Sequence, residues 1–512
     1  GPPFTKIIAI YPRNVLLADQ FREAIAESGK LRPVLQSAGI RPLTFGALLG
    51  NTPWRTAFDS SRNNRPRAET DHDWRRVGNG FVVPFLKSPL APNEDLIWRD
   101  ADSRAGRTCL YRASGDQAQP DVPDGVLYLT RDDLMDNPPD ILFLSVEMLN
   151  REMGNPRWAR TFGIGQGARS PRLLLLDEVH AYEGIQGAQV AWILRRWRQA
   201  CRIRNLHVVG LSATLKEATA HLARVAALRQ EHIHEFRPLD AELDYESIEY
   251  NLAVKGDPAA GTSLLSTSIQ CGMVLARVLT PRGQLPTPPN LPLHPERFFG
   301  RKLFGFTDNL DVVNRWLTDM SDAERNRQLA RHRLHPIHQT PQPTPMPSAG
   351  EIAQRDLLGQ IWELPRRLGH NLSQPLLVTR CSSQDPGADV NADLVIATSS
   401  LEVGFDDPLV GAVLQHKRPL SIASFIQRKG RAGRQRGTRP WTLVVLSDYG
   451  ADRWVFQQAE RLFEPELDEL RLPLHNPYVL RIHATYFLIE WIGRRIGRAS
   501  PFDYLRRPDD AA

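Results

Sequence analysis

Residues 173–180 read LLLLDEVH, four leucines followed directly by Asp177 and Glu178 and then by His180. An uninterrupted apolar run of this kind is typical of a strand buried on both faces, as in parallel sheets covered by helices. Ligands of such sheets bind beyond the carboxyl ends of the strands, which is where the two acids lie. A strand that simply ends in solvated acids is the alternative interpretation.

Strands and helices are predicted to alternate on both sides of this run. Further strands of the first series are expected at 6–11, 43–49, 125–129, 141–145 and 206–211, with helices at 16–28 and 187–201. A second series has strands expected at 302–306, 375–379, 394–397, 412–415 and 441–446. Alternation of this kind predicts a doubly wound parallel sheet in each series. The predicted fold class is therefore α/β, with two such domains in tandem.

The predicted domain boundaries are a first domain at 1–235, a linker at 236–262, a second domain at 263–463 and a helical C-terminal extension at 464–512. Residues 51–125 lose the periodicity of helix or strand, so they are predicted as an irregular insertion in the first domain. The Trp and Arg side chains of this insertion suit base stacking or packing onto the first domain. Two proline-rich stretches, 281–295 and 336–347, are predicted as extended loops of the second domain.

Length and composition exclude a disordered or a fibrous protein. The chain has 512 residues, of which 41% are hydrophobic, and a formal net charge of +6. This charge fits a polyanionic partner or a solvated basic surface equally well. The four cysteines lie far apart without C-x-x-C spacing, which predicts neither a zinc site nor a disulfide framework and fits a reducing cytoplasm. No apolar run of about 18 residues occurs, so no membrane span is expected.

Two further runs carry residues suited to phosphate chemistry. In residues 211–215 (LSATL), Ser212 and Thr214 follow an apolar strand and are placed to hydrogen-bond the acids of a neighbouring strand end, although helix capping is an alternative. Residues 427–434 (QRKGRAGR) hold four cations and two glycines. Because guanidinium binds phosphate in a bidentate way, Arg431 and Arg434 are predicted as arginine fingers. A basic patch facing nucleic acid or solvent is the alternative.

Residues 395–407 (VIATSSLEVGFDD) form another strand followed by small hydroxyl residues, Gly404 and Asp406. Hydroxyl groups at a strand end, such as that of Thr398, can contact backbone phosphates without reading bases. Turn formation and helix capping are the alternative roles of these residues.

Taken in chain order, the four runs resemble successive motifs of superfamily 2 helicases: residues 173–180 motif II, 211–215 motif III, 397–407 motif V and 427–434 motif VI. Residues 11–20 (YPRNVLLADQ), 145–149 (SVEML) and 304–309 (FGFTDN) resemble motifs Ia, Ib and IV, and the likeness spans about residues 6–447. Residues 180–191, the Arg195-Arg196 pair and the turn at 50–53 resemble the Lhr and YprA-like DNA helicases. Residues 401–408 (LEVGFDDP) with 427–434 resemble helicases of bacterial phage-defence or DNA-modification islands.

This resemblance implies two RecA-like domains that use ATP and Mg²⁺ and move along single-stranded or duplex nucleic acid, with DNA favoured. Asp177 is predicted as the Mg²⁺ ligand and Glu178 as the group that orients or deprotonates the attacking water, with Arg431 and Arg434 as catalytic arginines. ATP binding and coupling are assigned to His180, Ser212, Thr214, Gly404, Asp406 and Gln427. Nucleic-acid binding is assigned to Pro12, Arg13, Asn14, Thr307 and Thr398. Partner subunits of a defence or modification system are a further expectation.

The sequence departs from the family pattern in two ways. No G-x-x-x-x-G-K-[ST] loop occurs, because Gly29-Lys30 is followed by Leu31 and residues 256–263 (GDPAAGTS) lack the lysine. The family places this loop before motif Ia, so it is expected upstream of Gly1, and the isolated chain is expected to hydrolyse little or no ATP. The C-terminal four-cysteine cluster of YprA-like helicases is also absent. The alternative is a nucleotide-independent nucleic-acid-binding scaffold, or one half of a split helicase.

Overall fold

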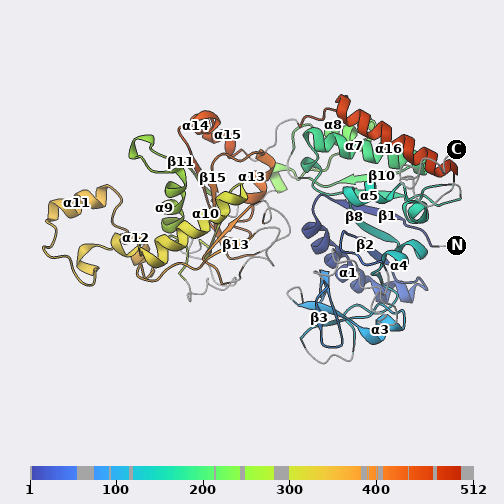
Figure 1. Cartoon of the computed structure of the whole chain (residues 1–512), viewed down its shortest axis with the longest axis horizontal. Helices are drawn as coiled ribbons and strands as arrows, with labels where there is room; N and C mark the ends of the chain where they lie inside the picture. Colours follow the sequence, from blue (N-terminus) through green and yellow to red (C-terminus); the bar gives the residue numbers. More distant parts are fainter. Residues whose placement is uncertain are drawn as a thin grey trace, which may run out of the picture. The chain divides into compact units, whose positions relative to one another are not determined.

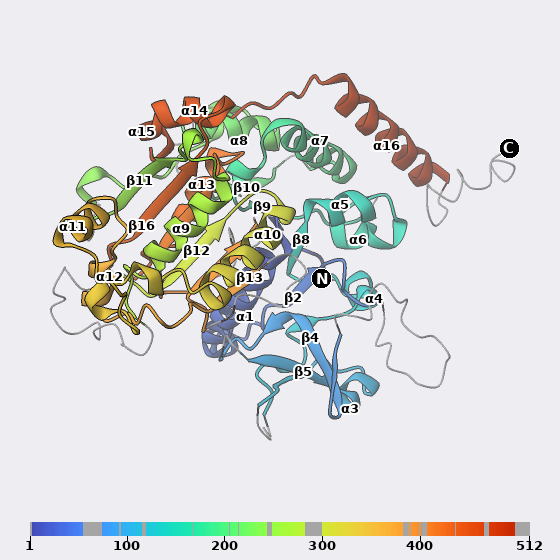
Figure 2. The same cartoon turned by 60° about the vertical axis from the view of Figure 1, so that its left-hand side comes forward.

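The computed structural model describes residues 3–54, 74–91, 94–114, 119–165, 167–203, 205–212, 215–242, 248–281, 299–381, 389, 391–398, 401, 407–435, 437–464 and 470–496. The chain divides into two compact units, one formed by residues 1–236 with 466–512 and the other by residues 237–465. Figures 1 and 2 show the elements of each unit, numbered along the chain.

The first unit is built on a six-stranded sheet in the order β10-β9-β1-β8-β2-β7, and its strand pairs are parallel. Its strands are β1 (Ile7–Tyr11), β2 (Phe45–Leu48), β7 (Leu127–Tyr128), β8 (Ile141–Ser145), β9 (Leu173–Leu176) and β10 (His207–Gly210). The four leucines at 173–176 are therefore β9, between β1 and β10. The prediction of an α/β fold with parallel sheets is confirmed.

Helices pack on both faces of this sheet, because successive side chains of a strand point to opposite faces. Leu142 and Leu144 of β8 belong to a core cluster that contains Trp197 of α7. Phe143, between them, meets the ring of Phe21 of α1 edge-on, with 5.1 Å between the ring centroids. The helices of this unit are α1 (Asn14–Ser37), α4 (Arg131–Asp136), α5 (Val146–Glu152), α6 (Ala159–Phe162), α7 (Gly184–Cys201), α8 (Ala218–Ala226) and α16 (Pro477–Ile496).

The insertion predicted as irregular at 51–125 contains regular structure, so that prediction is wrong for its described part. A four-stranded antiparallel sheet with the helix α3 is formed there, by β3 (Arg76–Val77), β4 (Gly80–Lys87), β5 (Asp95–Arg99), β6 (Leu110–Arg112) and α3 (Asp100–Arg104). Pro84 and an irregular register inside β4 hide the alternation of apolar residues. Trp74 and Trp98 are buried and donate to the carbonyls of Asn51 and Arg107, which makes them packing residues.

The predicted C-terminal extension contains a long helix that belongs to the first unit. Figure 1 shows this helix, α16, alongside α7. The buried guanidinium of Arg196 in α7 donates to Asn150 Oδ1 at 2.9 Å, lies 3.0 Å from His483 Nδ1 and forms an ion pair with Glu490. This network fixes the C-terminal helix to α7.

The second unit is a second six-stranded parallel sheet, in the order β11-β16-β15-β12-β14-β13. Its strands are β11 (Tyr250–Lys255), β12 (Lys302–Phe306), β13 (Val378–Cys381), β14 (Leu394–Ala397), β15 (Val410–His416) and β16 (Trp441–Leu446). β14 and β15 are buried along their whole length, as the centre of a two-faced sheet requires. Part of the predicted linker at 236–262 is therefore a strand of this sheet, β11.

The helices of the second unit are α9 (Leu264–Ala276), α10 (Leu310–Ser321), α11 (Ala349–Leu357), α12 (Glu363–Arg367), α13 (Ile422–Lys429), α14 (Gly450–Gln457) and α15 (Ala459–Leu462). A buried ion pair joins Arg277 to Glu324 through two contacts of 2.7 Å, and Glu324 also accepts from the backbone N–H of Leu376. These bonds tie the end of α9 to the segment that enters β13. Within the described part of the chain, the helices are all too short or too polar to cross a membrane.

Candidate functional site

The carboxyl ends of three neighbouring strands bring the predicted acidic site together in the first unit. Ile10, Leu176 and Gly210 lie in register on β1, β9 and β10. The backbone N–H of Asp177 donates to the carbonyl of Ile10 at 3.1 Å, and that of Leu211 donates to Leu176 at 2.9 Å. The residues after each strand, which include Pro12, Asp177 and Ser212, therefore lie at one edge of the sheet.

Glu178 adopts a left-handed backbone conformation, with φ 48° and ψ 50°. For a residue with a Cβ this conformation costs roughly 1–2 kcal/mol, and such positions cluster at functional sites. The strained turn leads into a short 3₁₀ helix at Val179–Ala181, and the N–H of Val179 donates to the carbonyl of Leu211 at 2.9 Å. The loop that carries the acids is thereby bonded to the segment that carries Ser212.

His180 links the acidic loop to the LSATL segment through its side chain. Its Nδ1 lies 3.3 Å from Glu178 Oε2 and 3.2 Å from Ser212 Oγ. Burial lowers the pKa of His180 to about 4, so the ring is neutral near pH 7. Because a carboxylate only accepts, Nδ1 must carry the ring proton when it bonds to Glu178. His180 thus positions Glu178 by donating a hydrogen bond from its neutral ring. No positive charge on His180 is involved.

Asp177 is a carboxylate in an unfavourable environment. Burial, followed by the nearby charge of Glu178, raises the pKa of Asp177 to about 6. Burial and the charge of Asp177 also raise the pKa values of Tyr11 and Tyr182 above the usual tyrosine value, so both phenols stay neutral. A bound cation next to Asp177 would restore its usual acidity, because opposite charge favours the ionised form. The environment of Asp177 therefore suits a bound cation.

His221 is a residue of this region that sequence reasoning missed. It lies in α8, is 1% exposed, and its Nε2 is 3.2 Å from the carbonyl of Val179, just after the two acids. Burial lowers the pKa of His221 to about 4, so the neutral ring donates to this carbonyl near pH 7. The sequence signal was a single histidine among the alanine, leucine and valine residues of this helix.

Three predicted nucleic-acid residues follow β1 at the same edge. Pro12 and Arg13 are half-buried, and Asn14 is exposed as the first residue of α1. The turn at residues 50–53 follows β2, and the buried guanidinium of Arg131 holds it by donating to the carbonyls of Leu49 and Thr52. Arg131 in turn pairs with Glu152 at 3.1 Å.

The second unit places its predicted hydroxyl residues at the carboxyl ends of adjacent strands. Thr307 follows β12 and Thr398 follows β14, and the N–H of Thr307 donates to the carbonyl of Ala397 at 3.1 Å. Thr398 is half-buried, whereas Thr307 is only 3% exposed. The predicted Thr214, Gly404 and Asp406 lie outside the described residues.

The QRKGRAGR run spans the end of α13 and the turn that follows it. Gln427 and Arg431 are half-buried, and Arg434 is exposed with its Nε donating to the carbonyl of Gly430 at 3.2 Å. Gly433 has φ +75°, and a Cβ there would lie 2.5 Å from the ring of Pro440. Only glycine fits this position, so the turn that presents Arg434 depends on it.

Arg428 has a structural role that the sequence did not reveal. Its guanidinium is buried, donates to Gln415 Oε1 at 2.8 Å and forms an ion pair with Asp308. Asp308 also accepts from the backbone N–H of Leu420 at 3.2 Å. Arg428 therefore anchors the QRKGRAGR run to the ends of β12 and β15. The sequence signal for this role of Arg428 was Gln415, a polar residue within the apolar run that forms β15.

No protein-family model matches the chain. It is 25% identical over 323 residues to the ATP-dependent helicase HRQ1 of Saccharomyces cerevisiae, covering 61% of this chain and 25% of that protein. It is 26% identical over 366 residues to the Lhr helicase/probable uracil glycosylase of Mycolicibacterium smegmatis, covering 68% of this chain and 21% of that protein. The chain thus spans about a quarter or less of these two relatives.

Among solved structures, the chain resembles the helicase Lhr of Mycobacterium smegmatis bound to ssDNA and AMP-PNP. The TM-score is 0.51 and the sequence identity 18%, over 95% of this chain and 46% of that one. At this identity the likeness concerns the fold alone, and it places the two parallel sheets in the tandem RecA-like fold.

Proposed function

Because this chain is related to the Lhr and HRQ1 helicases, we propose that it is the motor core of an ATP-dependent helicase or translocase that acts on nucleic acid, with DNA favoured. The observation that carries the proposal is the carboxyl edge of the first sheet. A strained Glu178, a desolvated Asp177 and a neutral His180 converge there, bonded to the LSATL segment.

Each residue has a definite role in this proposal. Asp177 would hold Mg²⁺, which supplies charge neutralisation at the nucleotide phosphates. Glu178, held by His180, would orient or deprotonate the attacking water. Arg431 and Arg434 would stabilise the negative charge of the transition state, and Gln427 with Ser212 would couple this chemistry to strand movement.

The nucleic-acid strand would lie against the residues that follow β1, β12 and β14, namely Pro12, Arg13, Asn14, Thr307 and Thr398. Such contacts reach phosphates and sugars, so we expect binding that is insensitive to base sequence and weakened by salt. Because Thr307 is buried, its contribution would come from its backbone or through a neighbour.

We further propose that the phosphate-binding loop lies outside these 512 residues. Within the described residues β10 pairs on one side only, with β9, and Val209 and Leu211 are 44% and 56% exposed. An outermost strand with exposed apolar side chains, such as β10, suits pairing with a further strand, since parallel sheets are normally covered. Without a lysine-bearing loop, the isolated chain should hydrolyse little or no ATP.

The test compares strand-stimulated ATP hydrolysis by a longer protein that includes the loop with that of its Glu178→Gln variant. We expect a loss of about 10²–10⁴-fold in kcat, because this substitution removes a general base. Glu231→Gln, an exposed acid of the same unit, is the matched control and should retain wild-type activity. Survival of hydrolysis in Glu178→Gln would show that the base is assigned wrongly.

The alternative function is a nucleotide-independent scaffold or one half of a split helicase, and the absence of the lysine-bearing loop from the sequence favours it. Fluorescence anisotropy with a labelled single strand separates the two. A motor should change its strand affinity when a non-hydrolysable ATP analogue is added to the longer protein. A scaffold should bind the strand equally with and without the analogue. A role in a phage-defence or DNA-modification island remains a separate prediction.

A further inference from the structure

The amino edge of the first sheet holds a cavity of about 310 Å³ that the proposed motor chemistry does not use. It is lined by residues that precede the strands, whereas Asp177 and its neighbours follow them. Lys6 comes directly before β1, Asp140 before β8 and Arg172 before β9. Since parallel strands align their like ends, the cavity and the acidic site lie at opposite edges of one sheet.

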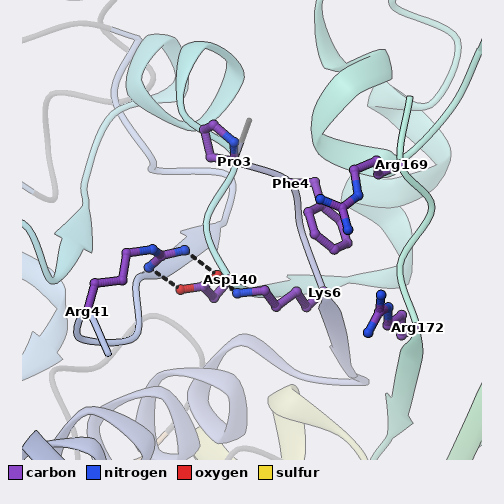
Figure 3. A pocket seen from close by; sticks show the side chains of 7 residues that line it. All are labelled: Pro3, Phe4, Lys6, Arg41, Asp140, Arg169 and Arg172. Atoms are coloured by element: carbon purple, nitrogen blue, oxygen red, sulfur yellow. Dashed lines mark hydrogen bonds and ion pairs between the residues drawn. The ribbon is translucent and has the colours of Figure 1, made fainter. Parts of the chain in front are cut away.

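The lining of this cavity is strongly cationic. Four positive side chains, Lys6, Arg41, Arg169 and Arg172, line it together with a single carboxylate, Asp140. Figure 3 shows Lys6 and Arg41 directed at Asp140, with Arg169 against the ring of Phe4 and Arg172 nearby. Four positive charges against one negative charge leave a surplus of three, and a concave site lined by one sign of charge concentrates ions of the opposite sign.

The cations of the cavity divide into two pairs. Arg41 donates to both oxygens of Asp140, at 2.6 and 2.8 Å, and Lys6 forms an ion pair with the same carboxylate. Arg169 lies 3.9 Å from the centroid of the Phe4 ring. No ion pair joins Arg169 or Arg172 to any carboxylate of the described residues. Both side chains are exposed to solvent.

We propose that this cavity binds a phosphate dianion, either free or as a terminal monoester, with Arg169 and Arg172 as its direct donors. Guanidinium groups match phosphate oxygens in a bidentate way and keep their charge at all relevant pH values. The surplus of three charges suits a dianion better than the single charge of a backbone phosphodiester. The cavity of about 310 Å³ falls within the usual range of small-molecule sites, so part of the group that bears the phosphate can also enter.

Asp140 positions the other two cations in this arrangement. The backbone N–H and the hydroxyl of Thr44 also donate to Asp140, at 3.0 and 3.1 Å. Asp140 is therefore fixed at the amino ends of β2 and β8. Lys6 and Arg41 are therefore held on Asp140 in the cavity wall, where they raise the positive potential, and the direct bonds to the ligand are left to Arg169 and Arg172.

The experiment measures binding of inorganic phosphate and pyrophosphate to the 512-residue chain by calorimetry at low salt, with Arg169→Gln, Arg172→Gln and the double variant. We expect saturable binding by the wild type and a loss of about tenfold for each single change. Arg229→Gln, an exposed cation of the same unit outside the cavity, is the matched control and should stay within about twofold. Both cavity arginines are exposed, so neither substitution should unfold the protein.

A second arm separates the sources of the phosphate. A single-stranded oligonucleotide with a 5′-phosphate is compared with the same oligonucleotide ending in a 5′-hydroxyl. If the phosphate end adds affinity that the double variant loses, the ligand is a nucleic-acid terminus. If only the inorganic anions respond, the ligand is a free phosphate compound. The inference is overturned if wild-type binding is not saturable, or if the double variant binds the anions as tightly as Arg229→Gln does.

Discussion

Two aspartates of one sheet show how the two edges differ. Asp140 comes directly before β8 and is buried, whereas Asp177 comes directly after β9 and is half-buried. Asp140 receives bonds from Arg41, Lys6 and Thr44, and although burial opposes its ionisation, these donors lower the pKa of Asp140 to about 2. Asp177 has the opposite shift, because burial and the charge of Glu178 raise its pKa to about 6.

The difference separates a carboxylate whose charge the fold stabilises from one whose charge the fold disfavours. At the amino edge, hydrogen bonds and cations offset the cost of burying the charge. At the carboxyl edge the fold supplies desolvation and a second acid, so the ionised state is disfavoured in the protein alone. Strongly perturbed carboxylates of the second kind are the ones expected at functional sites.

The largest expected effect comes from Asp140→Asn, which breaks the amino-edge network. The variant keeps one acceptor oxygen but loses the charge that Arg41 and Lys6 bind, so we expect the free energy of unfolding at pH 7 to fall by about 2–4 kcal/mol. Urea unfolding followed by circular dichroism measures it. Asp136→Asn, an exposed acid nearby, should change stability by less than about 0.5 kcal/mol. Equal effects of the two changes would contradict the role of Asp140.

The carboxyl edge should respond in the opposite direction. Asp177→Asn removes a charge that the fold disfavours, so we expect stability at pH 7 to rise by about 1–3 kcal/mol without nucleotide or divalent cation. The same variant should lose the stabilisation that Mg²⁺ with nucleotide gives to the longer wild-type protein. Thermal unfolding with and without these ligands tests both statements. A destabilised Asp177→Asn would mean that the fold itself pairs this carboxylate.

The pH dependence sharpens the comparison further. The folded pKa of Asp177 is raised, so the stability lost by ionising its carboxylate is zero below about pH 4 and grows as pH rises towards 6. The stability gained by Asp177→Asn should therefore vanish by about pH 4. The folded pKa of Asp140 is lowered, so its contribution is complete above about pH 4 and is lost as pH falls towards 2. Denaturant unfolding at pH 7, 5, 4 and 3 measures both. Parallel curves for the two variants would refute the distinction.

The smallest expected effect comes from Ser212→Ala. This change removes one neutral hydrogen bond to His180, at an exposed position, so we expect a loss of only about 0.5–1.5 kcal/mol in stability. If Ser212 couples the two loops, the longer protein should instead show reduced strand-stimulated hydrolysis with near-normal hydrolysis in the absence of a strand. Steady-state kinetics with and without a single strand make this comparison.

How far the sequence predicts this molecule depends on the pattern involved. The four leucines before Asp177 predicted a buried strand, because an uninterrupted apolar run places apolar side chains on both faces of a strand. The sheet at β3 to β6 was not predictable, since Pro84 and an irregular register interrupt the alternation in its longest strand. Arg428 reads as one more cation in a basic run, yet its buried bonds to Gln415 and Asp308 arise from strands distant in sequence. A positive charge predicts contact with solvent or phosphate, and only the tertiary structure shows that Arg428 is buried and bonded within the protein instead.

The attachment of α16 to α7 through Arg196 also constrains how the protein is made. The first unit combines residues 1–236 with residues 466–512, and the second unit lies between these two parts in the sequence. During synthesis on the ribosome, the sheet around Asp177 emerges before the second unit, whereas α16, which packs on α7, emerges after it. Until α16 emerges, Arg196 has Asn150 but not Glu490 or His483 as a partner, so its guanidinium stays open to water until the whole second unit has been translated.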